Sequence, residues 1–523
     1  MNGAEALVQT LARCGVNTYF ANPGTSEMHL VSALARERDV RLILCLFEGV
    51  ATGAADGYGR MRGVPAATLL HLGPGYANGG ANLHNARKAM TPLLNIVGDH
   101  ATYHRRFDAP LTSDIAAWAA PNSRWVKSAD KADEIGPLAS EAVTSSYGPP
   151  GGCATLIVPA DSAWSSTSVL GHASIRPRGP SVDAAAVSAA AAALAAAAKP
   201  VLFLGGECLR EAGLQIAARL VNARRLRAPL RIMSETFPAR QARGRGRLAP
   251  NRMMYFAEQA LADLDGVDVM VAVGAPEPIA FFAYPGRPSR LAPEGCRVTS
   301  LAKPGANVID ALSGLSDLLE GTTLAERAAP PPPPPPLPQG ALNPKTVGIS
   351  LARHLPNQAI VSDDGVTSSL PIYLLTSDAQ PHDWLALTGG AIGQGLPLAV
   401  GAAVACPERK VISLNGDGAA MYTIQALWTI ARERLDVTVI IFANDIYAIL
   451  QIELARTGAN TSGAPALPVL RLDDPSINWS KLGESLGLRC SECLTAESFD
   501  AALAHAMQTA GPELIVVRLP PSV

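Results

Sequence analysis

The sequence has no excess of charge of either sign and no long hydrophobic run. Its 43 Lys and Arg residues balance 45 Asp and Glu residues, which leaves a formal net charge of −2. No basic run is interleaved with aromatic residues, so the pattern is not that of a nucleic-acid-binding surface. The longest apolar segment, residues 184–198, is nearly all alanine. It is too short and too weakly apolar to cross a membrane, and it predicts a helix at the start of a domain.

Cysteine is scarce as well. The eight cysteines are scattered along 523 residues, several of them within apolar segments. This favours buried thiols in a reducing cytoplasm over a disulfide framework. We therefore expect a cytoplasmic protein with neither nucleic-acid nor membrane partners. A chain of this length is too long for one hydrophobic core and predicts about three domains.

Apolar strands alternate with helices along most of the chain. This alternation predicts buried, mostly parallel sheets with helices on both faces. We expect three open, doubly wound α/β units at residues 1–180, 181–328 and 342–523. Residues 329–341 contain seven consecutive prolines, which predict an extended polyproline linker between the second and third units.

The most informative motif follows an apolar strand in the last unit. Gly416-Asp417-Gly418 forms a turn before a helix, and a second apolar strand, residues 437–443, ends in Asn444. Hard divalent cations such as Mg²⁺ prefer oxygen ligands and share them with phosphates. Asp417 and Asn444 supply such oxygens from neighbouring strand ends, while glycine N–H groups and the helix N-terminus can approach an anion. The motif therefore predicts a site for a metal and a phosphate group.

The spacing of this motif, with Asn444 standing 27 residues after Asp417, resembles the signature of thiamine-diphosphate enzymes. Glu48, in Phe47-Glu48-Gly49, matches the glutamate that activates the cofactor in that family. His71 matches an active-site histidine of benzoylformate decarboxylases. Together these residues resemble the superfamily of pyruvate decarboxylase, acetolactate synthase and benzoylformate decarboxylase, with acetolactate synthase large-subunit-like proteins as the nearest group. The resemblance implies a pyrimidine-binding first unit, a central unit and a diphosphate-binding last unit.

The resemblance also implies the cofactors and their ligands. Thiamine diphosphate and Mg²⁺ are expected, whereas FAD is not. The cofactor would lie between two subunits, so that a homodimer is the catalytic unit and a homotetramer the expected assembly. Asp417, Asn444 and the backbone carbonyl of Ile446 would bind the metal. The cofactor-binding residues that the resemblance implies are Glu48, Asn78, Gly365, Val366, Gly390, Ile392, Gly416, Asp417, Gly418, Ala419, Asn444, Ile446 and Tyr447.

Three residues are catalytic candidates. The resemblance implies that Glu48 contacts the pyrimidine ring, where a carboxylate favours the imino tautomer that removes the thiazolium C2 proton. An ordinary acid at a helix N-terminus is the alternative. His71 is expected to handle protons, although a histidine at a strand end is often structural. Thr25 either binds the carboxylate of the substrate or caps the following helix.

An apolar pocket is expected around the substrate. Benzoylformate decarboxylases carry a second histidine in the middle domain, where this chain has Phe281 and Phe282. Leu111 stands where acetolactate synthases have a glutamine. These departures suggest a substrate with an apolar or aromatic side chain. The candidate pocket residues are Thr25, His71, Leu72, Leu111, Phe281 and Leu450.

A further departure concerns Asp363 and Asp364, which directly precede Gly365. The resemblance implies that the backbone of Gly365 and Val366 meets the diphosphate. Two carboxylates beside that anion would repel it unless they point away or bind a cation.

The expected activity is that of a lyase or transferase, a thiamine-diphosphate- and Mg²⁺-dependent 2-oxo acid decarboxylase and carboligase similar to acetolactate synthase. The ylide of the cofactor would add to a 2-oxo acid and carbon dioxide would leave. The product would then be protonated or ligated to a second carbonyl compound. A benzoylformate-decarboxylase-like lyase that does not ligate, and a non-catalytic homologue that only binds the cofactor, are the alternatives.

Overall fold

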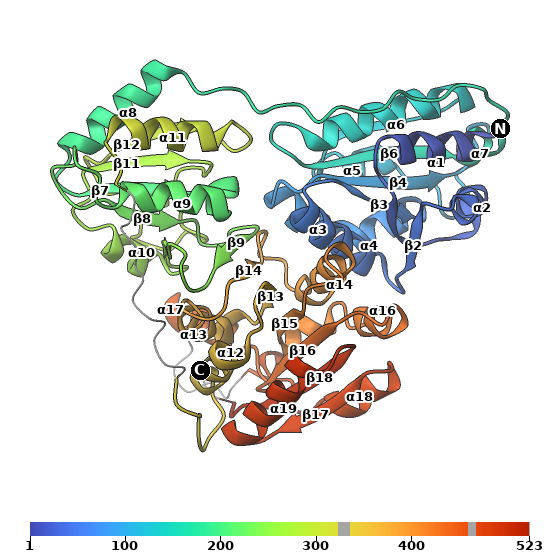
Figure 1. Ribbon diagram of the computed structural model, residues 1–523. Coiled ribbons are helices and arrows are strands. Elements are labelled where there is room, and N and C mark those ends of the chain that lie inside the picture. Colours follow the sequence, from blue (N-terminus) through green and yellow to red (C-terminus); the bar gives the residue numbers. More distant parts are fainter. Residues whose placement is uncertain (323–334, 459–466, 522–523) are drawn as a thin grey trace.

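The computed structural model describes residues 1–322, 335–458 and 467–521. Within these residues the strands form three mostly parallel sheets of six, five and seven strands, with helices packed around them (Figure 1). We call the parts that carry these sheets the first, central and third units. The architecture confirms the expected α/β class with three open sheets. Residues 329–334 of the predicted proline-rich linker lie outside the described residues.

The first sheet brings the early polar motifs to one edge. Its strand order is β2-β1-β3-β4-β6-β5, and every pair is parallel. The carboxyl ends of parallel strands share one edge, where ligands bind in such sheets. The strands are β1 (Thr18–Asn22), β2 (Arg41–Leu44), β3 (Ala66–Leu70), β4 (Leu93–Asp99), β5 (Ser123–Ser128) and β6 (Cys153–Pro159). The helices are α1 (Gly3–Arg13), α2 (Met28–Arg36), α3 (Glu48–Arg62), α4 (Leu72–Lys88), α5 (Ile115–Ala119), α6 (Ala132–Tyr147) and α7 (Ala160–Trp164).

The central sheet has the order β10-β8-β7-β11-β12 and is parallel throughout. The alanine-rich run forms its first helix, α8, as the sequence predicts. The strands are β7 (Pro200–Leu204), β8 (Arg231–Ser234), β10 (Asn251–Arg252), β11 (Val269–Val273) and β12 (Arg297–Ala302). The helices are α8 (Ala184–Ala196), α9 (Glu211–Leu220), α10 (Ala257–Asp263) and α11 (Val308–Leu318).

The third sheet has the order β17-β18-β16-β15-β13-β14-β9. Its edge strand β9 (Gln241–Arg243) comes from the chain between β8 and β10, and it pairs antiparallel with β14. The other strands are β13 (Ala359–Asp364), β14 (His382–Leu385), β15 (Val411–Gly416), β16 (Val437–Ala443), β17 (Arg489–Cys493) and β18 (Glu513–Arg518). The helices are α12 (Pro344–His354), α13 (Ser369–Leu375), α14 (Gly395–Ala405), α15 (Asp417–Met421), α16 (Ala426–Arg432), α17 (Ala448–Arg456), α18 (Trp479–Ser485) and α19 (Ala496–Gln508).

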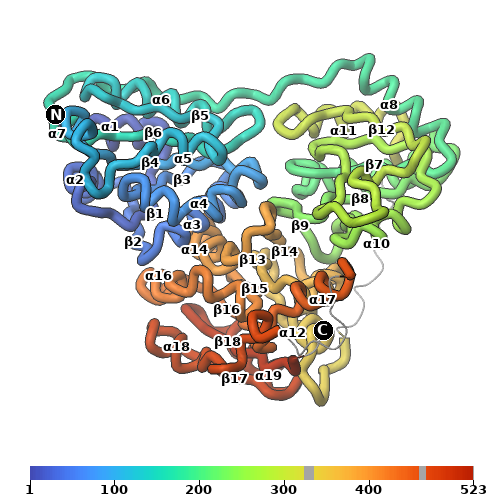
Figure 2. The backbone as a smooth tube through the Cα atoms, turned by 180° about the vertical axis from the view of Figure 1, so that it is seen from behind, coloured from blue at the N-terminus to red at the C-terminus, as the bar shows by residue number. Residues whose placement is uncertain are grey.

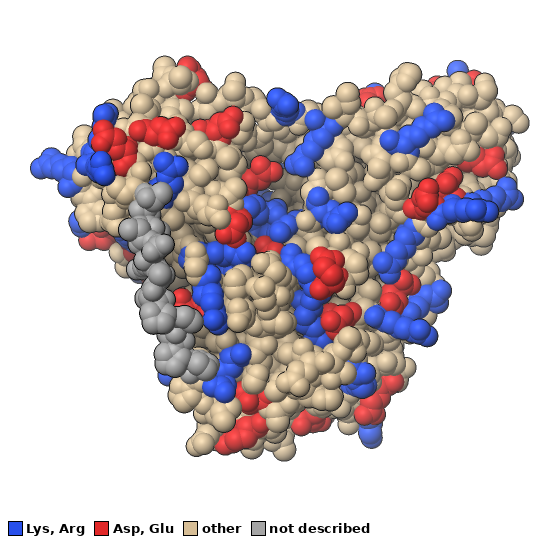
Figure 3. Space-filling view, viewed as in Figure 1, with Lys and Arg blue, Asp and Glu red and all other residues tan. Residues whose placement is uncertain are grey.

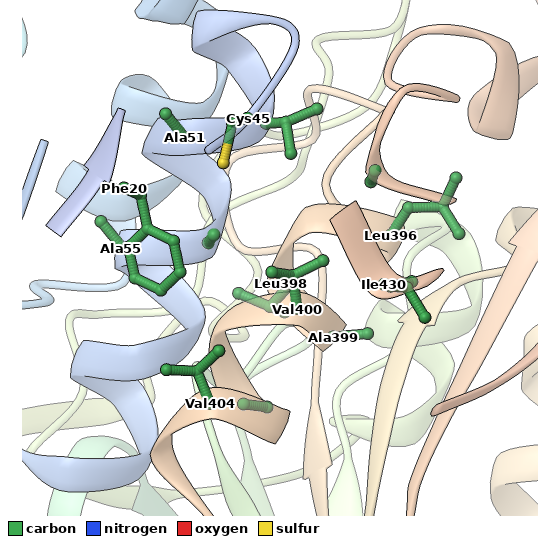
Figure 4. Packing of buried hydrophobic residues seen from close by; sticks show 14 of the residues in the cluster. Phe20, Cys45, Ala51, Ala55, Leu396, Leu398, Ala399, Val400, Val404 and Ile430 are labelled. Carbon is green, nitrogen blue, oxygen red and sulfur yellow. The ribbon is translucent and has the colours of Figure 1, made fainter. Parts of the chain in front are cut away.

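Helices α3 and α14 join the first and third units, which meet in the view from behind (Figure 2). Every residue of α14 is buried, and apolar side chains of the two helices share one core (Figure 4). An ideal Cβ on Gly57 would overlap the carbonyl oxygen of Leu398, and one on Gly401 would overlap that of Ala54. Only glycine allows two helix backbones to approach so closely. This crossing fixes α3, which begins at Glu48.

Across the described ranges, we find no helix with the length and apolar character that a membrane crossing requires.

Candidate active site

Glu48 is the first residue of α3 and lies between two asparagines. Only 6% of its surface is exposed. The side-chain amide of Asn22, at the end of β1, donates to Oε1 of Glu48 over 3.2 Å, and the amide of Asn78 on α4 donates to Oε2 over 3.0 Å. These neutral contacts orient the buried acid without neutralising its charge. Each oxygen keeps a lone pair for a ligand.

His71 lies directly after β3, against the end of β1. Its Nδ1 is 2.8 Å from Oε2 of Glu27 and 3.2 Å from Oγ of Ser26. Glu27 is fully buried and accepts the backbone N–H of Gly24 over 2.8 Å. An ideal Cβ on Gly24 would overlap the imidazole ring, so glycine is required there. A carboxylate on Nδ1 keeps a proton on that nitrogen, which leaves Nε2 as the nitrogen available to a ligand.

Sequence reasoning missed Ser26 and Glu27. It singled out Thr25, which is exposed at the start of the 3-10 helix η1 (Thr25–Glu27). The hydroxyl that contacts His71 belongs to its neighbour Ser26, and the role of Thr25 stays a prediction. The signal was present, because an acid three residues after Gly24 fits the pattern in which a side chain turns back to bond a backbone N–H.

The predicted metal loop lies at the ends of the neighbouring strands β15 and β16. Asp417 begins α15 and is 3% exposed. Its Oδ1 accepts the N–H of Gly418 over 2.8 Å, and its Oδ2 accepts the N–H of Asp445 over 2.7 Å. Asn444 Oδ1 accepts the N–H of Ile446 over 3.3 Å. The fold therefore brings the predicted ligands Asp417, Asn444 and Ile446 into one loop pair.

This donor set fits Mg²⁺. A carboxylate, an amide oxygen and a backbone carbonyl are hard oxygen ligands. Burial raises the pKa of Asp417, and a cation beside it would oppose that shift. In the ranges the structure covers, no cluster of three His, Cys, Asp or Glu residues could hold a metal. The candidate Mg²⁺ site contains only one such side chain, Asp417, so this absence does not bear on it.

The rest of this loop packs against Tyr447. An ideal Cβ on Gly418 would overlap the Tyr447 ring, whereas the nearest atom to one on Gly416 is 4.0 Å away. The backbone of Gly416 is therefore open to contact with a ligand. Ala419, in α15, is buried. Leu450, on α17, is 46% exposed, so this predicted pocket residue faces solvent in the single chain.

Loop 386–394, between β14 and α14, carries Gly390 and Ile392. Gly390 has a φ of 75°, and an ideal Cβ there would lie 2.6 Å from Cζ of Phe281. The structure thus brings the central unit's Phe281 onto a predicted cofactor-binding residue. Ile392 is partly exposed. Leu111, by contrast, packs at the edge of the core shared by the first and third units.

The two acids before Gly365 are buried and hydrogen-bonded. Asp363 accepts the N–H of Gly365 over 3.1 Å and the indole N–H of Trp384 over 3.0 Å. Asp364 accepts three backbone N–H groups at the start of α14. Both carboxyl groups are therefore turned into the fold, where N–H groups offset part of their charge.

Three non-glycine residues with positive φ follow strand ends of these loops. Leu72 (49°) follows β3, Val366 (50°) follows β13 and Asp445 (55°) follows β16. Each such conformation costs about 1–3 kcal/mol, and for the β-branched Val366 it is a genuine outlier. Leu72 is fully buried and Val366 is 38% exposed. These loops therefore carry three of the eight non-glycine residues with positive φ among the described residues.

The predicted residues form two groups, around Glu48 and around Asp417. In the part of the chain that the structure describes, no hydrogen bond joins these groups. One cavity in the described residues, of about 800 Å³, lies elsewhere, and residues of the first and central units line it, including Arg60, Arg210 and Arg240. None of the predicted site residues lines it. Figure 3 shows basic side chains gathered around the hollow where the units meet on this face.

Comparison with known proteins identifies the family. Residues 1–118 match the family "Thiamine pyrophosphate enzyme, N-terminal TPP binding domain", and residues 369–517 match "Thiamine pyrophosphate enzyme, C-terminal TPP binding domain". A Mycobacterium tuberculosis protein named "Putative acetolactate synthase large subunit IlvX" is 47% identical over 99% of each chain. The chain belongs to the thiamine pyrophosphate enzyme family. Its resemblance to thiamine-diphosphate-dependent enzymes is thereby confirmed.

Other thiamine-diphosphate enzymes share its whole length. Benzoylformate decarboxylase of Pseudomonas aeruginosa is 30% identical over 98% of each chain. The solved 4-hydroxybenzoylformate decarboxylase of Rhodococcus jostii RHA1 superposes with a TM-score of 0.83 at 25% identity, covering all of both chains. Benzoylformate decarboxylase from Polynucleobacter necessarius, at 21% identity and a TM-score of 0.84, shows the same fold. The protein is a thiamine-diphosphate-dependent enzyme.

Proposed function

We propose that this enzyme uses thiamine diphosphate and Mg²⁺ to decarboxylate a 2-oxo acid and to ligate the product to a second carbonyl compound, as in acetolactate synthases. The observation that carries the proposal is Glu48, a buried carboxylate oriented by the amides of Asn22 and Asn78. A buried acid without a cation is costly. Glu48 nevertheless stands at the start of α3, and each of its oxygens has a lone pair that the asparagines do not use. This arrangement supports a role in holding a proton on the pyrimidine ring.

Two groups of residues would hold the cofactor. Asp417, Asn444 and the carbonyl of Ile446 would bind Mg²⁺ and through it the diphosphate. The open backbone at Gly416, together with Gly365 and Gly390, would contact the cofactor directly. When bound, thiamine diphosphate supplies an electron sink that allows carbon dioxide to leave a 2-oxo acid.

The remaining residues would orient the substrate and move protons. His71 presents Nε2, because Glu27 occupies Nδ1. It can therefore give a proton to the product or take one from it. Phe281 and Leu450 offer exposed apolar surface, which supports a 2-oxo acid with an apolar or aromatic side chain.

The position of His71 also favours a second candidate function. A histidine that delivers a proton would release an aldehyde before ligation takes place. This is the outcome expected of a lyase similar to benzoylformate decarboxylase.

The test is to incubate the protein with Mg²⁺ and thiamine diphosphate, to offer pyruvate and benzoylformate separately, and to identify the products. Carbon dioxide release with either acid is expected. A 2-hydroxy ketone or acetohydroxy acid would support ligation, and an aldehyde alone would support the lyase. Turnover of neither acid, nor of longer apolar 2-oxo acids, would contradict the proposal.

Glu48→Gln tests the proposed role directly. The variant should lose roughly 10²–10⁴-fold in rate, because a neutral amide cannot take up the ring proton. Calorimetry should still detect cofactor uptake, since Asp417 and Asn444 are intact. An unchanged rate would refute the role of Glu48. Asp417→Ala is the matched variant, and it should lose cofactor uptake itself.

A further inference from the structure

Asp364 collects three consecutive backbone donors. It is the last residue of β13 and only 1% exposed. Its Oδ2 accepts the N–H of Gly393 over 2.8 Å, that of Gln394 over 3.0 Å and that of Gly395 over 3.1 Å. These N–H groups end loop 386–394 and begin α14. The carboxyl group therefore caps the N-terminus of α14 by accepting N–H groups that lack a partner within the helix.

The same carboxylate connects the segments that would contact the cofactor. Asp364 directly precedes Gly365 and Val366, and the loop that it ties down carries Gly390 and Ile392. The far side of the loop is held by other bonds. Asn85 donates to the carbonyl of Ala391 over 2.8 Å, and Thr423 donates to that of Gly393 over 2.8 Å. From β13, Asp364 accepts the three N–H groups, and Ser362 donates to the carbonyl of Gly395 over 2.8 Å.

The surroundings of Asp364 differ from those of a buried acid whose oxygens are all hydrogen-bonded. Asp364 and Asn415 are direct partners across β13 and β15. Among the described residues, Oδ1 of each is buried without a hydrogen-bond partner. An ideal Cβ on Gly395 would overlap Oδ1 of Asn415 and would lie 2.6 Å from Cβ of Asp364. Asp363 is the charged neighbour, whereas α14 presents only backbone N–H groups. Burial raises the pKa of Asp364 to about 7. Near neutral pH a proton on Oδ1 of Asp364 would therefore give Asp364 and Asn415 a hydrogen-bond donor.

We propose that Asp364 is a positioning residue that sets the conformation of loop 386–394 for cofactor binding, acting through the N–H groups of Gly393, Gln394 and Gly395. The purpose of this conformation rests on the proposed function, whereas the contact itself does not. α14 packs on α3, so the same cap also supports the helix that begins at Glu48.

The decisive measurement is amide hydrogen exchange on the protein without cofactor. Asp364→Ala should speed exchange at residues 393–395 roughly tenfold or more, because three N–H groups lose their acceptor. Asp364→Asn keeps an oxygen acceptor and should stay close to wild type. Asp500→Ala is the matched control, since Asp500 is a buried acid on α19 that accepts from Ser350. Unchanged exchange in Asp364→Ala would overturn the proposal.

Cofactor affinity is the second measurement, made by calorimetry with Mg²⁺ and thiamine diphosphate. Asp364→Ala should raise the Kd roughly tenfold or more, whereas Asp364→Asn and Asp500→Ala should not. An unchanged Kd in a variant with fast loop exchange would overturn the positioning role. If wild type itself takes up no cofactor, the proposed function fails, and the exchange experiment still decides the contact.

A pH series serves if the alanine variant does not fold. The folded carboxyl keeps its proton up to about pH 7, whereas the unfolded one loses it near 3.8. Wild type should therefore lose stability as the pH rises through this window. The Tm of wild type relative to Asp364→Asn should fall from pH 4 to pH 7. Parallel curves would overturn the placement of this carboxyl.

Discussion

At the scale of single residues, Glu27 and His71 are 44 positions apart and meet at the ends of β1 and β3. The motif pattern singles out His71 and Glu48, because their neighbours in sequence match the family. The spacing of Gly24 and Glu27 predicts an acid that bonds a backbone N–H, but the contact of Glu27 with His71 depends on the pairing of β1 with β3, which no spacing shows. Asp364 is a similar case. Next to Gly365 it looks repulsive in sequence, and only the fold shows three N–H groups around it.

Glu27→Gln tests whether this acid positions His71. The variant should lose about 10- to 100-fold in kcat with little change in KM, because the imidazole is no longer held by a charged acceptor. Glu27→Asp should recover part of the loss only if the charge matters. The control is Glu141→Gln, which removes an exposed acid on α6 that pairs with Lys127. A KM effect without a kcat effect would contradict the assignment.

At the scale of elements, strands and helices follow from the alternating pattern, but two features do not. β9 has three residues and pairs antiparallel with a strand about 140 positions away, with a register of His382 against Arg243. Nothing local marks such a strand. The crossing of α3 and α14 is also invisible in sequence, because small residues in a helix look like high helix propensity or flexibility until the partner backbone is known.

Gly401→Ala tests this crossing. The added methyl would meet the carbonyl oxygen of Ala54, and backbone cannot move aside as a side chain can. We expect a loss of about 3 kcal/mol in the free energy of unfolding, measured by urea denaturation. Gly80→Ala is the control, because no atom of the described residues lies within 4 Å of an ideal Cβ on this glycine in α4. It should gain about 0.5–1 kcal/mol, and equal effects at both sites would contradict the packing argument.

At the scale of the whole molecule, apolar residues are exposed beside both half-sites. Leu46 is 45% exposed two residues before Glu48, and Tyr422 is 55% exposed just after α15. Single exposed apolar side chains are ordinary on a protein surface. The proposal that a second copy of the chain completes the site, with the Glu48 group of one copy facing the Asp417 group of the other, therefore rests on the family resemblance.

Mixing two inactive variants tests this arrangement. Glu48→Gln and Asp417→Ala each spoil a different half-site, so a mixed dimer has one intact site if the halves come from different subunits. After joint unfolding and refolding, about a quarter of the wild-type activity should return. No recovery in mixtures that size-exclusion and mass analysis show to be mixed dimers would place both halves in one chain.

The short strand β9 has one more consequence. Because a stretch between β8 and β10 closes the outer edge of the third sheet, the three units are not interchangeable modules. A fragment that begins after the proline-rich stretch would leave β14 as an unpaired edge strand. Such a strand can pair with strands of other molecules. The central unit could therefore be replaced by another domain only if the replacement also supplied a strand that pairs with β14.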